Sequence, residues 1–202
     1  FDMDLLIQHS RFATDGANTE RNAHPHRVGN ITGIHNGVIN NHKALFKALE
    51  SWIDENPDVA DDLEDNDTDT AVIWTMLDMM GDSNNDSVEV MSQSCAGTMR
   101  IAWVDIREKE SPTDSPRLHL WSNTSDLWFA ETVNGNVVFA SEKGFLENAF
   151  GDYEPRDGGN QKLGNCIVPG TLQPAKINHH YIVDYEHGLI DLGEVGAQAK
   201  AS

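Results

Sequence analysis

The sequence predicts an α+β fold, because segments with strand patterns come first, segments with helical periodicity follow, and further strand patterns end the chain. An apolar run over residues 2–8 predicts the first strand. A second strand is expected over residues 28–34, where two glycines suit the close approach of a neighbouring backbone or a ligand. The polar stretch over residues 11–19 is expected to be a loop.

Three helices are expected in the middle of the chain. Asn40 or Asn41 would cap the first helix. Its apolar residues, at helical spacing, are Leu45, Phe46, Leu49, Trp52 and Ile53. The second is capped within residues 67–70 and ends at Gly81, and its inward-facing residues are Val72, Ile73, Met76, Leu77 and Met80. The third covers residues 87–94, and the methionines and Trp74 are expected to fill the core.

The second half of the chain has the pattern of short β-strands. These strands are expected at residues 98–106, 117–122, 127–131, 136–141, 166–168, 181–185 and 189–192. Asn134-Gly135 predicts a type I′ hairpin turn, and residues 186–188 predict a second hairpin. Residues 151–164 are expected to form a surface loop.

The composition favours a single acidic domain. The 202 residues have a formal net charge of -19, from 33 acidic and 14 basic residues. This charge argues against binding to nucleic acid or to an anionic membrane. The acidic stretch over residues 54–69 is expected to be a solvated loop between helices. A halophilic or viral source would account for the same balance.

Cysteine usage and hydropathy predict a cytoplasmic location. Cys95 and Cys166 are far apart and lack metal-type spacing, so neither a disulfide framework nor a cysteine metal site is indicated. Both are expected to be small buried residues. No apolar run approaches the roughly 20 residues that span a bilayer.

Polar residues of a distinctive kind gather over residues 9–37 and recur at residues 68–73. The motifs are HSRFAT at residues 9–14, NAHPH at 22–26, HNG at 35–37 and TDTAVI at 68–73. Together, and in this order, they resemble the class II glutamine amidotransferase domain, an N-terminal-nucleophile (Ntn) hydrolase. The resemblance is greatest to the glutaminase domain of glucosamine-6-phosphate synthase.

The resemblance implies a more definite fold than the residue patterns alone. It implies a four-layer αββα sandwich of two antiparallel sheets over residues 1–195, followed by a tail over residues 196–202. The family's nucleophile is a cysteine at the start of the mature chain, several tens of residues before the HSR motif. The sequence given starts at Phe1, so the resemblance places that cysteine and the first strands upstream of it. The domain is therefore expected to be incomplete at its N-terminus as given.

The resemblance also assigns roles to residues of the motifs. Asn36 and Gly37 match the oxyanion hole, where an amide side chain and a backbone N–H meet the developing negative oxygen. Arg11 matches the group that binds the substrate α-carboxylate, and Asp69 matches the carboxylate that binds the α-ammonium group. The other expected substrate contacts are Phe12, where a tryptophan is usual, Thr14 and His24. No cofactor and no metal are implied.

The implied activity is hydrolysis of the L-glutamine side-chain amide to glutamate and ammonia. The ammonia would pass to an unidentified acceptor, in a separate synthase domain or subunit, within an oligomer or larger assembly. The alternative is a catalytically inactive structural or interaction subunit on the same fold. A metal-dependent hydrolase using His24 and His26 is a further interpretation. Taken singly, Asn36-Gly37 also suits a hairpin turn, and Arg11 an ordinary ion pair.

Overall fold

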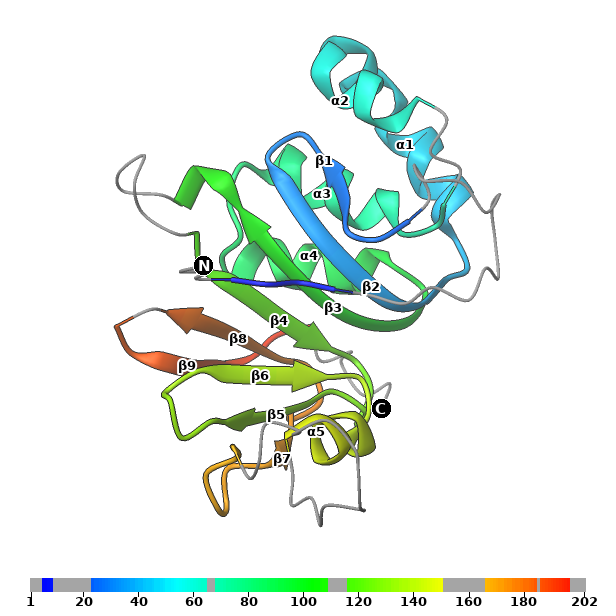
Figure 1. Cartoon of the computed structure of the whole chain (residues 1–202). Helices are drawn as coiled ribbons and strands as arrows, with labels where there is room; N and C mark the ends of the chain where they lie inside the picture. Colours follow the sequence, from blue (N-terminus) through cyan, green and yellow to red (C-terminus); the bar gives the residue numbers. More distant parts are fainter. Residues whose placement is uncertain are drawn as a thin grey trace.

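A computed structural model of the chain describes residues 5–8, 23–64, 68–108, 116–150, 166–184 and 186–196. These residues form two antiparallel sheets flanked by helices (Figure 1). The first sheet has the order β1-β2-β3-β4-β8-β9, and its strands are β1 His26–Val28, β2 Ile31–Ile39, β3 Gly97–Asp105, β4 Leu118–Ser122, β8 His179–Asp184 and β9 Gly188–Glu194. The second has the order β6-β5-β7, and its strands are β5 Trp128–Glu131, β6 Val137–Ala140 and β7 Gln173–Pro174.

The elements are arranged as four layers. The helices are α1 His42–Glu55, α2 Pro57–Leu63, α3 Ala71–Met80, α4 Asn85–Ser94 and α5 Lys143–Phe150. One core joins α1, α3 and α4 to the six-stranded sheet, and a second lies between the two sheets. Phe129 of β5 belongs to the second core, whereas the neighbouring Trp128 lies under Lys143 of α5 at 5.9 Å. Since neighbouring strand residues point to opposite faces, α5 covers the outer face of the smaller sheet. The predicted αββα sandwich is confirmed.

The close approach of α3 to β2 is possible because residue 33 is glycine. A Cβ atom on Gly33 would lie 2.6 Å from the ring of Trp74 and 2.8 Å from Cβ of Trp103. Both tryptophans are fully buried. The expected role of glycine in this strand, allowing a close neighbour, is therefore confirmed for Gly33, and the neighbour is a pair of indole side chains.

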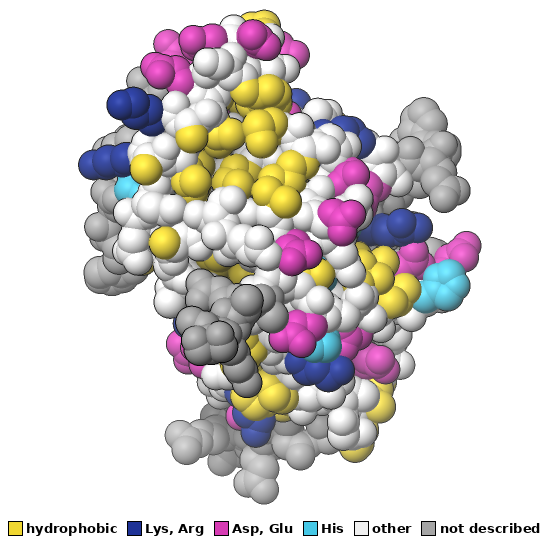
Figure 2. Space-filling model, turned by 180° about the vertical axis from the view of Figure 1, so that it is seen from behind, with side chains coloured by type: hydrophobic (Ala, Val, Ile, Leu, Met, Phe, Trp, Pro, Cys, Tyr) yellow, Lys and Arg dark blue, Asp and Glu magenta, His cyan; other side chains and the backbone are white. Residues whose placement is uncertain are grey.

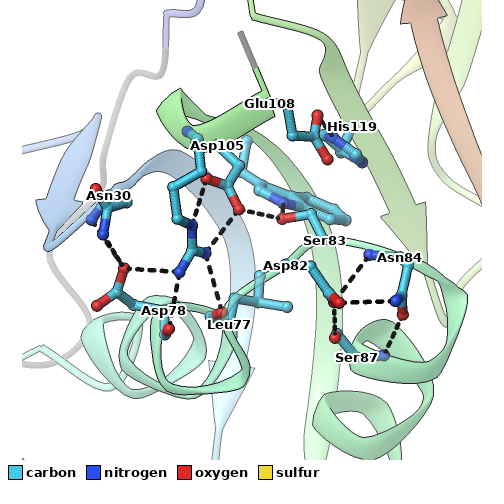
Figure 3. Close-up of polar contacts among 12 residues, drawn as sticks. Asn30, Leu77, Asp78, Asp82, Ser83, Asn84, Ser87, Asp105, Glu108 and His119 are labelled. Carbon is cyan, nitrogen blue, oxygen red and sulfur yellow. Dashed lines mark hydrogen bonds and ion pairs between the residues drawn. The ribbon is translucent and has the colours of Figure 1, made fainter. Parts of the chain in front are cut away.

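A charged network holds the end of α3 against the sheet. The guanidinium of Arg107 donates to both carboxylate oxygens of Asp105, at 2.8 and 2.7 Å, and to the backbone oxygen of Asp78 (Figure 3). Asp78 in turn accepts from the backbone and side chain of Asn30, in the β1–β2 turn. Asp105 is fully buried and also accepts from Ser83. The network satisfies this buried charge, which would otherwise be costly.

A second polar chain is buried beneath α4 and joins it to β8 and β4. Asn85 donates to the backbone oxygen of Leu192, so its side-chain oxygen accepts from Nδ1 of His180 at 2.8 Å. Nε2 of His180 then accepts from Nδ1 of His119 at 3.0 Å. Nε2 of His119 lies 2.7 Å from Glu108. The two imidazoles stack with Trp103, and burial beside His119 lowers the pKa of His180 to about 3.

Several predicted strands are confirmed, and others differ. The strands at residues 98–106, 117–122, 127–131 and 136–141 correspond to β3 to β6, and the C-terminal hairpin corresponds to β8 and β9. The strand expected at residues 28–34 is correct only for residues 31–34, which belong to β2, because Gly29 and Asn30 form a two-residue turn that pairs Val28 with Ile31. Residues 166–168 contribute only an isolated bridge, between Ile167 and Thr132.

The predicted turn at residues 133–135 is also wrong, and the described part of the strand predicted over residues 2–8 is not a strand. The type I′ turn at residues 133–135 is instead a loop in which Gly135 alone has positive φ, with its N–H bonded to the carbonyl of Thr132. Residues 5–8 form no regular strand, although Leu5 and Ile7 pack on the core between the sheets and Leu6 is exposed. The loops expected at residues 11–19 and 151–164 lie outside the described residues, as does nearly all of the expected tail.

The helix predictions are mostly confirmed. The apolar face of α1 packs on the core as expected, and α3 ends at Gly81. Asn41 occupies the N-cap position of α1, but its side chain binds Ser94 and Ala96 at the far end of α4 instead. Part of the acidic stretch expected to be a loop forms the last turn of α1 and helix α2, which begins at Pro57. Helix α5 was not predicted.

Charge and apolar surface are unevenly distributed. From the helix side, acidic side chains gather at the end of the molecule that carries α1 and α2, next to hydrophobic side chains (Figure 2). The acidic residues of α2 are Asp58, Asp61 and Asp62.

Among the helices of the described residues, none combines the length and apolar character needed to cross a membrane.

The pKa of His180 predicts how stability depends on pH. The folded chain keeps this imidazole neutral down to about pH 3, whereas an unfolded histidine takes up a proton near pH 6.5. The free energy of unfolding should therefore be highest above pH 6.5 and fall as the pH decreases from 6.5 towards 3. Urea unfolding of the wild type and His180→Gln at pH 7, 5.5 and 4 measures this, and the variant should lose less stability over the interval. Parallel pH profiles for the two proteins would contradict the assignment.

Candidate functional site

Asn36 and Gly37 lie inside strand β2, not in a turn. They pair with Arg100 and Met99 of β3, and the pairing continues to the end of both strands. The hairpin interpretation of Asn36-Gly37 is therefore wrong. Ile34 of the same strand belongs to the core between the sheets, so by alternation Asn36 and Val38 face the same side. Asn36 is half-buried and Val38 is 42% exposed, so this face reaches the surface at the end of β2.

Gly37 is held by the close approach of the two strand backbones. A Cβ atom at this position would lie 1.8 Å from the carbonyl oxygen of Thr98 and 2.6 Å from Nε2 of His35. The same imidazole nitrogen lies 3.1 Å from that carbonyl oxygen, while Nδ1 contacts the hydroxyl of Thr70 at 3.0 Å. His35 is almost fully buried, so it joins β2, β3 and the start of α3 at one point. Only glycine leaves room for this arrangement.

Asp69 contacts the backbone of the same strand, β2, at its last residue. One of its carboxylate oxygens accepts a hydrogen bond of 2.5 Å from the backbone N–H of Ile39, two residues after Gly37. Thr70 occupies the N-cap position of α3, and its side chain makes no capping hydrogen bond. The prediction that α3 is capped within residues 67–70 is therefore correct in position. Asp69 and Asn36-Gly37, 32 to 33 residues apart in sequence, are brought to the same end of β2.

Arg100 is a member of this group that sequence analysis missed. Its Nη1 donates to the backbone oxygen of Asn36 at 3.2 Å and to the side-chain oxygen at 3.3 Å. Its Nη2 forms an ion pair of 2.8 Å with Asp126, on the connection between β4 and β5. The alternation of β3 places Arg100 on the inner face of the sheet, but its register against Asn36 is a long-range property that the sequence does not reveal.

The other predicted site residues divide into two groups. His24 lies just before β1, with its ring 4.4 Å from that of His26 in an edge-on arrangement. His26 is buried, and Thr68 contacts its Nδ1 at 3.4 Å, which ties this segment to the one that carries Asp69. Arg11, Phe12 and Thr14 lie outside the described residues.

Neither a metal centre nor a reactive thiol at Cys95 is found in the part of the chain that the structure describes. Cys95 is buried at the end of α4, and burial raises the pKa of its thiol to about 12. It is therefore a protonated, unreactive thiol at neutral pH. Cys166 is half-buried and belongs to the segment beside the smaller sheet. No group of three or more metal-ligating side chains occurs among the described residues.

Comparison with known sequences gives a consistent set of relatives. The chain is 52% identical over 46 residues to the glutamine-fructose-6-phosphate aminotransferase (isomerizing) of Wigglesworthia glossinidia brevipalpis, which covers 23% of this chain and 8% of that protein. It is 28% identical over 145 residues to the enzyme of the same name from Listeria innocua, which covers 70% of this chain and 22% of that protein. The matched region is thus less than a quarter of these relatives. No family model matches the chain.

Solved structures share the fold. A glutamine phosphoribosylpyrophosphate amidotransferase from B. subtilis superposes with a TM-score of 0.60 at 16% identity, covering 91% of this chain and 33% of that one. A glutamine aminotransferase class-II domain protein from Silicibacter pomeroyi gives a TM-score of 0.50 at 13% identity, covering 85% of this chain and 71% of that one. At these identities the likeness concerns the fold.

Fold and sequence together point to one class of protein: the chain resembles class II glutamine amidotransferase domains, and it has the Ntn-hydrolase fold. Within that class, its sequence is similar to part of the glutamine-fructose-6-phosphate aminotransferases. The resemblance inferred from the four motifs is confirmed at the level of the family.

Replacing Gly37 should disturb the strand pair that carries the candidate site. Gly37→Ala places a methyl group against the carbonyl of Thr98, so the backbones must separate. We expect the free energy of unfolding to fall by about 1–3 kcal/mol, as for other overpacked positions. Urea unfolding measures this. Gly144→Ala in α5 is the matched control, since a Cβ there meets open space and alanine favours a helix by roughly 0.5–1 kcal/mol. Equal stability of the two variants would refute the close-approach argument.

Proposed function

We propose that this domain hydrolyses the side-chain amide of L-glutamine, releasing L-glutamate and ammonia. The observation that carries the proposal is that Asn36-Gly37 and Asp69, which accepts from the N–H of Ile39, lie at the same end of β2, where the inner face of the sheet reaches the surface. Similarity to the glutamine amidotransferase family supports the same reaction. An amide donor and a backbone N–H can stabilise the negative oxygen that forms during amide hydrolysis, and a carboxylate can bind the α-ammonium group of an amino acid.

The reaction proposed for this site has two steps. A thiolate attacks the side-chain carbonyl carbon of glutamine, and the negative charge that develops on the oxygen is met by Nδ2–H of Asn36 and N–H of Gly37. The C–N bond then breaks, and ammonia leaves with the proton that the base has removed from the thiol. Water next cleaves the thioester, which releases glutamate and restores the thiol. In both steps the two donors stabilise charge that the ground state lacks.

The remaining roles concern the α-amino acid end of the substrate. We assign the α-ammonium group to the carboxylate of Asp69, and the α-carboxylate to the guanidinium of Arg11, which suits bidentate binding. Phe12, Thr14 and His24 would complete the pocket. Asp69 also binds the Ile39 N–H, so one carboxylate would both fix the strand end and bind substrate.

The nucleophile is proposed to be a cysteine that precedes Phe1 in the natural protein. A terminal cysteine can use its own α-amine as the base, so no separate histidine is needed. Cys95 does not suit this role, because its thiol is buried and its pKa is raised to about 12. Cys166 lies beside the smaller sheet.

The ammonia would be used elsewhere in a larger enzyme. The matched relatives are several times longer than the matched region. We therefore propose a separate synthase domain or subunit as the acceptor, within an oligomer or larger assembly.

Removal of the proposed oxyanion donor tests the function. In the natural full-length protein, Asn36→Ala should lower kcat for glutamine hydrolysis by ~10²-fold to 10³-fold, as loss of one such donor does elsewhere. KM should change little, because the interaction forms mainly in the transition state. Glutamate and ammonia release are measured together to check the stoichiometry.

Asn134→Ala is the matched control, since Asn134 is exposed in the β5–β6 hairpin. It should retain the wild-type rate. A folded full-length protein that releases no ammonia from glutamine would overturn the proposal. If it bound glutamine without hydrolysis, an inactive structural or interaction subunit would be the better description.

A further inference from the structure

We propose that Arg100 is a positioning residue for the oxyanion hole, which fixes the side-chain amide of Asn36 in the orientation that presents Nδ2–H to the substrate. The inference rests on the proposed glutaminase function and deepens it. It assigns a role to a residue outside the four sequence motifs.

The geometry is set by strand register. Arg100 and Asn36 are direct partners across the β2–β3 pair, and both side chains face the space between the sheets. One guanidinium nitrogen, Nη1, contacts both oxygens of Asn36, at 3.2 Å to the backbone oxygen and 3.3 Å to Oδ1. The other, Nη2, binds Asp126 at 2.8 Å. The guanidinium is thus held between the strand that carries the site and the connection that leads into the second sheet.

This contact removes the ambiguity in the orientation of the Asn36 amide. A guanidinium donates five hydrogen bonds and accepts none, so the amide atom that faces Nη1 must be the oxygen. The Nδ2–H groups are consequently directed away from Arg100 and are available to another acceptor. The positive charge also polarises the amide, which strengthens Nδ2–H as a donor. Both effects favour the proposed role of Asn36.

A simple surface ion pair accounts for less of what is observed. Exposed ion pairs contribute little to stability, and Asp126 is 55% exposed. The Arg100 side chain is only 20% exposed, and its Nε is buried without a hydrogen-bond partner among the residues that the structure describes. Burying an unsatisfied donor is unfavourable. The arginine therefore lies deeper than its pairing with Asp126 requires, at the depth where Nη1 reaches Asn36.

The test uses the natural full-length protein and a double-mutant cycle. Arg100→Met should lower kcat for glutamine hydrolysis by roughly tenfold to a hundredfold, the cost of a small misplacement of a reacting group, with KM nearly unchanged. In the Asn36→Ala background the same substitution should change kcat by less than about threefold, because Arg100 acts through Asn36. Arg117→Met, which removes the exposed ion pair with Asp184, is the matched control and should retain the wild-type kcat.

A second variant and a second measurement distinguish loss of positioning from misfolding of the Arg100→Met protein. Arg100→Lys keeps the charge and the aliphatic stem but loses the planar fork, so its kcat should also fall. In ¹⁵N relaxation measurements, the side-chain amide of Asn36 should be ordered in the wild type and mobile in Arg100→Met.

The outcomes separate the two proposals. If the wild type hydrolyses glutamine and either Arg100 variant keeps its kcat, or if the losses from Arg100→Met and Asn36→Ala multiply, the inference is overturned and the glutaminase function stands. If the wild type is folded but inactive, the function fails and the positioning role of Arg100 fails with it. Loss of kcat that disappears in the Asn36→Ala background, together with a mobile Asn36 amide, supports the inference.

Discussion

The antiparallel pairing of β2 with β3 is the interaction on which the rest of the structure depends. All nine residues of β2 have partners in β3, from Ile31 opposite Asp105 to Ile39 opposite Gly97. One face of this pair receives α3 at Gly33, and the other face forms part of the core between the sheets. At one end of the pair, Asp105 anchors the Arg107 network. At the other end, Gly37 and Arg100 define the candidate site.

The charged groups at the two ends of the β2–β3 pair are neutralised in different ways. At the Asp105 end the charges are satisfied by one another and by backbone groups, so the network is structural (Figure 3). At the Asn36 end the Arg100 charge is opposed only in part, by an exposed carboxylate. The net charge of -19 has little influence on the Asn36 end of the pair, because salt at physiological concentration screens exposed charges that lie more than about 8–10 Å away. Local groups therefore decide what the site attracts.

Much of the fold could be predicted from the sequence, since hydrophobic periodicity determines the strands β3 to β6 and the helices α1, α3 and α4. The failures occur where local patterns have two solutions. Asn36-Gly37 suits a two-residue turn as well as a strand, and only the pairing with residues 97–105, about 60 positions later, favours the strand. Helix α2 was not predicted, because its acidic residues are typical of a solvated loop. Pro57 at its start and Val59 on its buried side are nevertheless consistent with a helix.

The candidate site shows the same division between local and long-range information. Its motif residues could be found because a glycine and an amide in the right order are visible in a linear sequence. The contacts that hold them could not, because Asp69 to Ile39, His35 to Thr98 and Arg100 to Asn36 each join different elements. These three contacts act on consecutive parts of one strand, whose outer face is held by α3 and whose inner face is held by the second core. A site built on such a strand is positioned by the elements that pack on both of its faces.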